Sequence, residues 1–283
     1  MSVDLESAKL AAEIPATRRV ELSDLPSGHK IGRHKNLVIS IISVLVFVTL
    51  WETVGRLGLI SPVFLPTPSM IFQEGVMLFQ HGIIQADILA STRRVLIGFG
   101  ISALLAIPLG LLMGTSEVLK AIFDPILSII RPLPAMSWIP LSMLWLGIGE
   151  SQKYAIVFMG AFAPLLVYVI DATRRIDPVI IKAAKNLGAG RLQIMKEVIL
   201  PGALPNILSG LKVVLAVAWT CIISAEMVGA SNGLGFRIWN AKDWNNTPQV
   251  LLGMVGISVT VLTIDVLFKR LEKRLIPWER SRR

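Results

Sequence analysis

Side chains that commonly carry enzyme chemistry are few and scattered in this sequence. The single cysteine, Cys221, lies within an apolar run and cannot form an intrachain disulfide. The three histidines lack the spacing of metal ligands; they are His29, His34 and His81. No Ser/His or His/Asp/Glu cluster suggests catalysis, and no Gly-x-x-x-x-Gly-Lys-Ser/Thr loop is present to bind nucleotide phosphates. The sequence therefore predicts no catalytic residue, no metal site and no cofactor held by this chain, and a membrane-embedded enzyme has no support.

The composition indicates a membrane protein. Of the 283 residues, 53% are hydrophobic and 17% are charged, and the mean hydropathy is +0.67. A soluble domain usually carries roughly 25% charged residues, and several apolar runs here approach the ~20 residues needed to cross a bilayer. The net charge of +9 could suggest nucleic acid as a partner, but Lys and Arg cluster beside the apolar runs, where they fix membrane orientation. These features exclude a disordered chain, a collagen-like chain, an ordinary cytosolic enzyme and a nucleic-acid-binding protein.

The apolar runs predict an all-α polytopic membrane protein with six transmembrane helices. They lie at about residues 36–54, 95–114, 119–147, 153–170, 207–228 and 250–268. Basic residues precede the first run, fill residues 171–206 and follow the last run, which places both termini in the cytosol. We therefore expect a cytosolic tail at residues 1–36, a transmembrane domain at 37–272 and a basic cytosolic tail at 273–283.

Three local features refine this topology. Residues 70–79 form a short amphipathic segment, expected at the outer interface. Gly110 and Gly114 have the spacing that lets two helices approach closely, although glycine is also simply common in membrane helices. Arg93 and Arg94 lie at the predicted outer end of the second span, against the charge rule.

The third span is interrupted by Arg131-Pro-Leu-Pro134. Pro132 and Pro134 lack the N–H that a helix needs, so they are expected to break or kink it. Broken backbone at membrane depth persists only where protein or a watery cavity satisfies it. The break is interpreted as part of a pathway or gate. A kink near the interface, with Arg131 extending to water, fits equally well.

Residues 177–201 are the most informative segment. Asp177-Pro178 predicts a helix start, and apolar residues then fall on one face, at positions 180, 181, 184 and 187. Gly188-Ala-Gly190 is expected to end that helix. A second amphipathic helix follows, and Leu200-Pro201 is expected to stop it. Two short helices joined by a glycine corner suggest a docking surface for a soluble partner; an amphipathic loop resting on the membrane is the alternative.

The same segment resembles the EAA loop of bacterial ABC importer permeases. That pattern is Glu-Ala-Ala, three residues, Gly, nine residues, Ile, one residue and Leu-Pro. Here it reads Lys182-Ala-Ala184, Gly188 and Val198-x-Leu200-Pro201, with every spacing kept. Val198 replaces isoleucine, and Lys182 replaces glutamate and so reverses a charge. Further stretches are similar to the taurine, alkanesulfonate and nitrate branch of these permeases: residues 91–94, 131–141, 144–150, 225–226, 233–235 and 274–278.

The resemblance covers about residues 45–280 and implies a type I ABC importer permease fold in the bacterial inner membrane. It implies three kinds of protein partner: cytosolic ABC ATPase subunits that hold ATP and Mg, a periplasmic solute-binding protein that docks on outer loops including residues 231–247, and a second permease copy. The residues expected to couple to the ATPase are Lys182, Ala183, Ala184, Gly188, Leu200 and Pro201.

The resemblance also suggests a substrate and a path for it. Taurine or another alkanesulfonate is expected, with nitrate, bicarbonate or another small organic anion as alternatives. The residues expected in the path or gate are Arg131, Pro132, Pro134 and Glu226. For Glu226, an interfacial carboxylate in contact with water is the alternative.

An ion-coupled secondary transporter is the main alternative from another class. Such a protein needs coupling carboxylates or a filter near the bilayer midplane. Midspan acidic residues are absent from the predicted spans, and no inverted repeat is evident. The sequence therefore favours a permease that depends on a separate ATPase.

Overall fold

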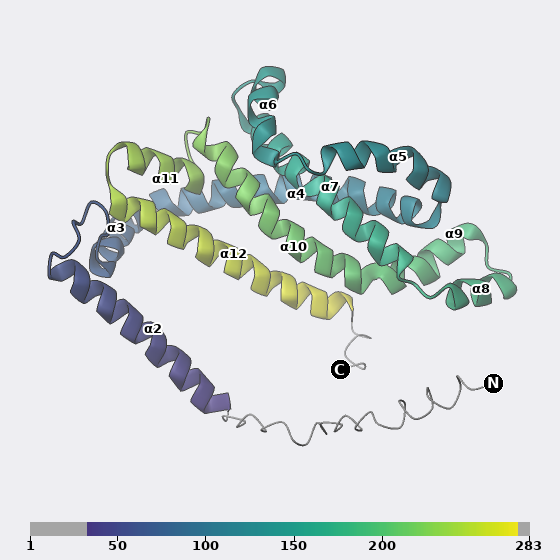
Figure 1. The fold of residues 1–283 in the computed structure, drawn as a ribbon, viewed down its shortest axis with the longest axis horizontal. Coiled ribbons are helices and arrows are strands. Elements are labelled where there is room, and N and C mark those ends of the chain that lie inside the picture. The colour runs from purple at the N-terminus through teal and green to yellow at the C-terminus, as the bar shows by residue number, and fades with distance from the viewer. Residues whose placement is uncertain (1–32, 277–283) are drawn as a thin grey trace, which may run out of the picture. The chain divides into compact units, whose positions relative to one another are not determined.

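A computed structural model of the chain describes residues 33–276, which form helices joined by short turns and contain no strand (Figure 1). The helices are α2 (Arg33–Arg56), α3 (Pro68–Gln80), α4 (Ile83–Thr115), α5 (Glu117–Ile130), η2 (Ala135–Trp138), α6 (Ile139–Leu146), α7 (Glu150–Arg174), α8 (Pro178–Asn186), α9 (Arg191–Gln193), η3 (Ile194–Ile199), α10 (Leu200–Met227), α11 (Leu234–Asp243) and α12 (Thr247–Leu275). The predicted tails lie largely outside the described residues.

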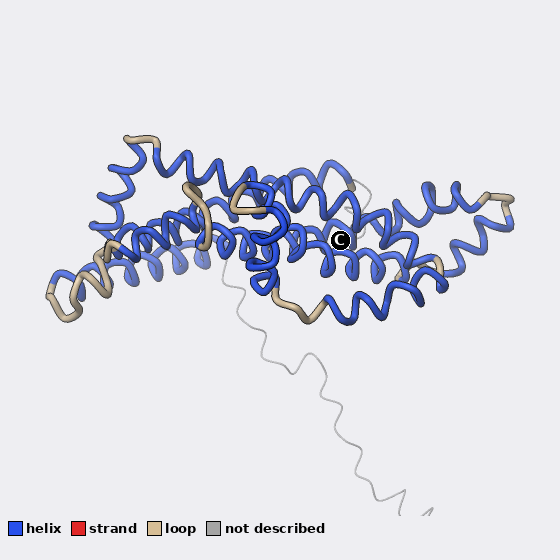
Figure 2. The backbone as a smooth tube through the Cα atoms, turned by 90° about the horizontal axis from the view of Figure 1, so that it is seen from above, coloured by secondary structure: helices blue, strands red, loops and turns tan. Residues whose placement is uncertain are grey.

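The chain divides into two compact units, residues 1–51 and 52–283. The described part of the first unit is most of α2, an apolar helix long enough to cross a membrane. The second unit is a helical bundle. We call the end of this bundle that carries α8 and α9 the inner end, and the end that carries α11 the outer end, following the orientation predicted from the charges (Figures 1 and 2).

Five of the six predicted spans correspond to helices that are long and apolar enough to cross a membrane. They contain α2, α4, α7, α10 and α12. The remaining span, the third, is divided: α5 ends at Ile130, and a short apolar stretch, Ala135–Leu146, follows as η2 and α6. Pro132 and Pro134 lie between these two parts, so the predicted break is confirmed. The amphipathic segment at residues 70–79 is also confirmed, as α3.

Small residues let α4 pack directly against α7. Gly98, Ser102, Ala106, Gly110 and Gly114 recur at every fourth position of α4 and form one stripe. A Cβ on Gly98 would lie 2.6 Å from Val157 Cβ, and one on Gly110 would lie 2.6 Å from Val169 Cβ. In both cases the partner lies 59 residues later in the chain, so the two helices run parallel in constant register. The close approach predicted at Gly110 and Gly114 is confirmed.

The third helix of the core is α10, which packs against both α7 and α4. Gly210 of α10 lies against Tyr168 of α7, and a Cβ there would be 2.7 Å from Tyr168 Cβ. Gly160 of α7 lies against Cys221 of α10 in the same way. Large side chains along these contacts are fully buried, among them Ile156, Leu165, Ile207 and Ile222. The polar site around Glu226, described below, is therefore positioned by three closely packed helices.

One predicted boundary was wrong. We call residues 177–201 the inner segment. Leu200-Pro201 does not stop its second helix, because α9, η3 and α10 form one continuous helix from Arg191 to Met227. Pro201 lies in the first turn of α10, and η3 just before it is π-helical. The wider π turn accommodates the missing N–H and the proline ring, so the chain continues instead of ending.

The glycine stripe supports a matched pair of substitutions on α4. Gly98→Ala would place a methyl group 2.6 Å from Val157 Cβ and 2.9 Å from the Tyr154 carbonyl, whereas Gly100 has open space around it. We expect Gly98→Ala to lower the stability of the detergent-purified protein by about 1–3 kcal/mol, as overpacking does. Gly100→Ala should be neutral or stabilising by up to ~1 kcal/mol, since alanine favours the helix. Thermal unfolding checks this, and equal melting temperatures for the two variants would contradict the close packing.

Candidate functional site

The inner segment begins and turns as its sequence predicts. The Asp177 side chain accepts a hydrogen bond from the Val179 N–H at 2.8 Å, and Pro178 occupies the first position of α8. The helix ends at Asn186, and Gly188 has a φ of +87°. The Ala189 N–H donates to the Ala184 carbonyl across this turn at 3.1 Å. The glycine corner is therefore a left-handed helix end, which favours a residue without Cβ.

The predicted coupling residues fall into two groups. Lys182, Ala183 and Gly188 are exposed around α8, and Ala184 is half-buried beside them. Leu200 and Pro201 are half-buried in the first turn of α10 instead. A cavity of about 230 Å³ opens between α8 and η3, lined by residues that include Ala184, Leu187, Gly188, Ile194, Glu197 and Val198. The structure thus brings Ala184 and Gly188 together on one concave surface, without Lys182, Leu200 or Pro201 in its lining.

Large apolar side chains are exposed on this inner segment. Leu187 is 89% exposed and Leu192 is 68% exposed, and Val179 and Ile180 are also exposed. Clustered apolar side chains of this kind mark surfaces that contact another protein or a membrane. The segment therefore has the small residues, the concavity and the apolar exposure of a docking surface.

The break between α5 and η2 carries three of the four residues predicted for the path or gate. Arg131, Pro132 and Pro134 are all exposed there. The Arg131 N–H closes the last turn of α5 by donating to the Leu127 carbonyl at 2.8 Å. Its side chain has no ion pair or hydrogen bond among residues 33–276. The guanidinium is therefore available to an anion or to another chain.

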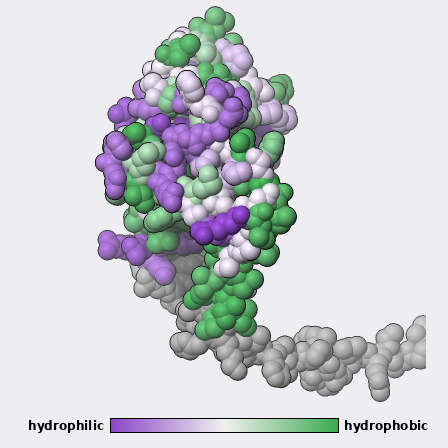
Figure 3. All heavy atoms as spheres, turned by 90° about the vertical axis from the view of Figure 1, so that its left-hand side faces the viewer, coloured by the Kyte–Doolittle hydropathy of each residue, from purple (hydrophilic) through white to green (hydrophobic). Residues whose placement is uncertain are grey.

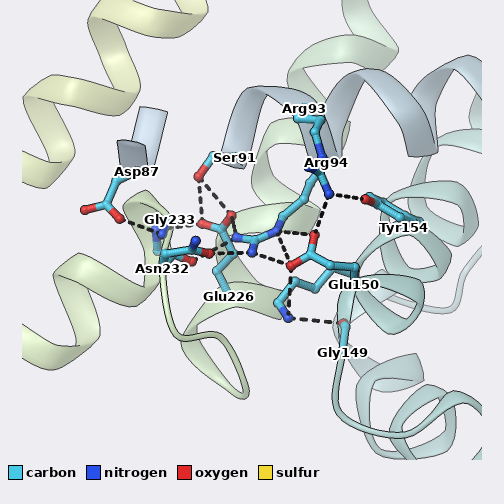
Figure 4. A network of polar contacts seen from close by, with 12 residues as sticks. Asp87, Ser91, Arg93, Arg94, Gly149, Glu150, Tyr154, Glu226, Asn232 and Gly233 are labelled. Carbon is cyan, nitrogen blue, oxygen red and sulfur yellow. Dashed lines mark hydrogen bonds and ion pairs between the residues drawn. The ribbon is translucent and has the colours of Figure 1, made fainter. Parts of the chain in front are cut away.

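The fourth predicted residue, Glu226, lies in a partly buried polar network at the outer ends of α4, α7 and α10 (Figure 4). We call it the outer polar cluster, and it consists of Asp87, Ser91, Arg94, Glu150, Lys153, Glu226, Asn232, Gly233, Leu234, Gly235 and Arg237. Glu226 is fully buried, so the alternative of a carboxylate in contact with water was wrong.

Arg94 joins three elements of this cluster. Its Nη1 donates to Glu226 Oε1 of α10 at 2.8 Å and to the Asn232 carbonyl at 2.8 Å. Its Nε donates to Glu150 Oε2 of α7 at 2.9 Å, and Nη2 donates to Asn232 Oδ1 at 2.6 Å. The side chain of Arg94 is only 3% exposed, while that of its neighbour Arg93 is 63% exposed and reaches Tyr154. For Arg94 the conflict with the charge rule thus has a physical reason, because its side chain points inward to carboxylates.

The N-terminus of α11 is capped by side chains of other helices. The Gly233 N–H donates to Asp87 Oδ1 at 2.8 Å, the Leu234 N–H to Ser91 Oγ at 2.9 Å, and the Gly235 N–H to Glu226 Oε2 at 2.9 Å. The first N–H groups of a helix have no partner within it and carry partial positive charge. The two carboxylates and the hydroxyl therefore accept these hydrogen bonds, and the carboxylates also offset the partial positive charge.

Glycine is required where this backbone meets Glu226. Gly233 has a φ of +113°, and a Cβ there would lie 2.5 Å from the Glu226 carboxyl carbon. A Cβ on Gly235 would lie 2.5 Å from the Ile223 carbonyl oxygen. Any side chain at either position would force the loop away from the carboxylate. The two glycines of Gly233-Leu-Gly235 therefore allow this backbone to contact the end of α10 directly.

Each carboxylate of the outer polar cluster is paired with a cation. Arg94 contacts Glu150 and Glu226, Arg237 Nε donates to Asp87 Oδ2 at 2.8 Å, and Lys153 and the exposed Arg93 each lie 4.0 Å from Glu150. Burying a charge costs several kcal/mol unless it is paired and hydrogen-bonded. The pairing therefore stabilises the buried members of the cluster, Asp87, Arg94 and Glu226.

Sequence reasoning found Glu226 and missed the other charged members. Arg94 and Glu150 lie in motifs noted for their resemblance, residues 91–94 and 144–150. They are 56 residues apart, and Arg94 and Glu226 are 132 apart. The only local signal was the presence of charges in otherwise apolar helices, which need partners of opposite sign.

Comparison with known proteins identifies the architecture. Residues 106–280 match the family described as the binding-protein-dependent transport system inner membrane component. The chain belongs to this family. It is 35% identical over 249 residues to the taurine transport system permease protein TauC of Escherichia coli (strain K12), covering 86% of this chain and 90% of that protein.

Other relatives point to the same branch of permeases. The putative aliphatic sulfonates transport permease protein SsuC of Bacillus subtilis (strain 168) is 31% identical over 97% of this chain and 98% of its own length. The nitrate import permease protein NrtB of Leptolyngbya laminosa is 28% identical over 69% of this chain and 70% of its own length. A solved structure of the inward-facing MetNI methionine ABC transporter has the same fold, with a TM-score of 0.62, 20% identity, and coverage of 69% of this chain and 97% of that one.

The predicted fold class and family are therefore confirmed. The chain is a multi-pass membrane protein and the permease subunit of an ABC importer, in the taurine, alkanesulfonate and nitrate branch. Permease subunits of this family are not themselves enzymes, and ATP is hydrolysed on a separate ATPase subunit. The family also works with a solute-binding protein.

Substitutions of the neighbouring residues Arg93 and Arg94 test the buried ion pair between Arg94 and Glu226. Arg94→Gln would leave Glu226 buried without its cation, and we expect a loss of about 3–5 kcal/mol of stability. Arg93→Gln removes an exposed side chain and should cost less than ~1 kcal/mol. The double variant Arg94→Gln with Glu226→Gln should recover part of the loss, because no unpaired carboxylate remains. Thermal unfolding in detergent measures all three, and equal losses for the two single arginine variants would contradict the burial of Arg94.

Proposed function

We propose that this chain is a bacterial inner-membrane permease that forms, with a second copy of itself, the translocation path for taurine or another alkanesulfonate. The main support is the 35% identity to TauC across 86% of the chain. A periplasmic binding protein delivers the solute to the outer end, and a cytosolic ATPase pair acts at the inner end. Nitrate is the second candidate substrate because NrtB is also a relative, though a more distant one.

In this proposal the inner segment seats in the ATPase. Ala183, Ala184 and Gly188 present small surfaces on which another backbone can pack closely, and Leu187 and Leu192 supply apolar area. Leu200 and Pro201 begin α10, so movement of the seated segment passes directly into a membrane helix. ATP binding favours one arrangement of the permease helices, and hydrolysis releases it. Lys182 stands where related loops carry glutamate and is exposed beside this surface.

The proposed path runs along the break between α5 and η2. Arg131 is exposed there, and a guanidinium forms charge-assisted hydrogen bonds with sulfonate as it does with other oxyanions. Pro132 and Pro134 keep the backbone non-helical beside it. Glu226 contributes to a gate at the outer end of the path. Its carboxylate is paired with Arg94 and buried, so it acts by holding the start of α11 through the Gly235 N–H and not by contacting the solute.

The proposal is tested by reconstituting the permease with its ATPase and binding protein in lipid vesicles. We expect accumulation of labelled taurine that requires ATP and the binding protein. Excess unlabelled alkanesulfonate should compete with this uptake, and nitrate should not. Uptake driven by an ion gradient in vesicles that contain the permease alone would contradict it and favour an ion-coupled transporter.

The docking of the inner segment is tested at two glycines. Gly188 has a φ of +87° and Gly190 a φ of −71°, and neither would have a neighbour within 4 Å of an added Cβ. Gly188→Ala should weaken capture of the ATPase by about ten-fold, because a left-handed conformation costs a residue with a Cβ ~1–2 kcal/mol. Gly190→Ala should bind normally. Co-purification of the ATPase and taurine uptake are measured for both variants. Normal transport by Gly188→Ala would show that this segment does not couple to the ATPase.

The proposed role of Arg131 in the solute path is tested by removing or keeping its positive charge. We expect Arg131→Gln to raise the KM of uptake by about two- to five-fold, as loss of an exposed charge worth up to ~1 kcal/mol would. Arg131→Lys keeps the charge and should stay near wild type. Uptake kinetics over a range of taurine concentrations give both values. An unchanged KM in Arg131→Gln would exclude this residue from the path.

A further inference from the structure

One continuous helix connects the inner docking surface to the outer polar cluster. It runs from Arg191 to Met227, a length of 37 residues, or about 55 Å at 1.5 Å per residue. Ile194 and Val198 near its inner end line the cavity beside α8, and Glu226 is its penultimate residue. No loop interrupts this helix, so a displacement of its inner end passes along a single element to its outer end.

At the outer end, Glu226 fixes this helix to two others. Its carboxylate accepts hydrogen bonds from Ser91 Oγ of α4 at 2.8 Å, from Arg94 of α4 and from the Gly235 N–H of α11. Ser91 Oγ in turn accepts from the Leu234 N–H. Figure 4 shows Ser91 and Arg94 pointing toward Glu226, with the loop at Asn232 and Gly233 folded beside it. The start of α11 cannot move relative to α10 without breaking several buried hydrogen bonds.

The cluster is suited to holding helices rather than to binding the solute. Glu226 is paired with Arg94 and Asp87 with Arg237, each at 2.8 Å, so the cations beside the α11 loop are already engaged within the chain. Ser91 and Glu226 are completely buried. The hydrogen-bond donors that face Glu226 are used within the chain. A permanent joint between helices accounts for these features, whereas a solute site needs free donors.

The element held by this joint faces the outer side. Residues 228–247 include α11, and Trp239 and Trp244 are exposed on them, with the Lys242 ammonium 4.4 Å from the Trp239 ring centroid. Figure 3 looks onto this end of the molecule, and polar side chains gather in the middle of the face. This is the surface assigned above to the binding protein.

We infer that Glu226 and Ser91 form a rigid joint between the helix α9–η3–α10 and α11, with Asp87 of α4 holding the start of α11 in place beside it. This joint would link ATP hydrolysis at the inner end to binding-protein docking at the outer end. Asp87 and Ser91 are positioning residues in this scheme, because they touch neither nucleotide nor solute. The inference rests on the proposed function, since it assumes an ATPase at α8 and a binding protein at α11.

The test measures how strongly the binding protein stimulates ATP hydrolysis. The full complex is reconstituted in lipid nanodiscs, and hydrolysis is recorded without and with taurine-loaded binding protein. We expect Ser91→Ala to lower the ratio of stimulated to basal rate by about five-fold, the lower end of ordinary coupling between two sites. Asp87→Asn, which replaces one acceptor by a donor beside Gly233 and Arg237, should lower it similarly.

Ser102→Ala is the matched control. Ser102 is also a fully buried serine of α4, but its hydroxyl donates to the Gly98 and Phe158 carbonyls, away from α11. Its ratio should equal that of wild type. Ser91→Thr retains the hydroxyl and should keep most of the stimulation. If Ser91→Ala acted only by disturbing the packing of α4, the hydroxyl of threonine would not restore the stimulation.

The outcomes separate the inference from the proposed function. If Ser91→Ala fails to assemble, Asp87→Asn decides the question. Wild-type ratios in the assembled variants, or equal losses in Ser91→Ala and Ser102→Ala, would overturn the inference and leave the function standing. A wild-type complex that no binding protein stimulates would overturn the proposed function and the inference with it.

Discussion

The burial of Arg94 against Glu226 is the interaction on which the outer half of the bundle depends. Away from water, an ion pair is stable only when every remaining donor and acceptor is also satisfied. Arg94 therefore requires Glu150 from α7, Glu226 from α10 and Asn232 from the following loop. One guanidinium thus fixes the mutual positions of α4, α7 and the end of α10 with the loop that follows it.

The small-residue stripe on α4 makes this pairing possible. Arg94 lies four residues before Gly98, so it continues the same face of the helix. The residue of α7 in the corresponding register, 59 positions later, is Lys153, and Glu150 lies one turn before it. Because Gly98 and Gly110 bring the two backbones together, Arg94 reaches Glu150 at the start of α7. Helix packing and charge pairing are therefore two consequences of one register.

The parts of the fold that sequence predicted well are those with local causes. Asp177 caps its own helix, Gly188 ends it, and Pro132 and Pro134 interrupt the third span, each through its own backbone chemistry. The prediction that the helix ends at Pro201 was wrong. A proline in a first turn can be accommodated when the preceding turn widens, and whether it widens depends on packing. The outer polar cluster could not be assembled from sequence, because apolar periodicity says where a charge is unusual and not which distant charge satisfies it.

The two ends of the bundle differ in a way that has mechanical consequences. At the inner end Leu187 lines a cavity and Leu192 lies beside it, and both side chains expose apolar surface that a partner would bury. At the outer end the polar groups of the cluster are already paired within the chain. A partner can therefore change the energy of the inner segment greatly, while the outer cluster resists rearrangement. Movement that starts at the inner segment would then reach the outer loop as a rigid displacement rather than being absorbed by local repacking.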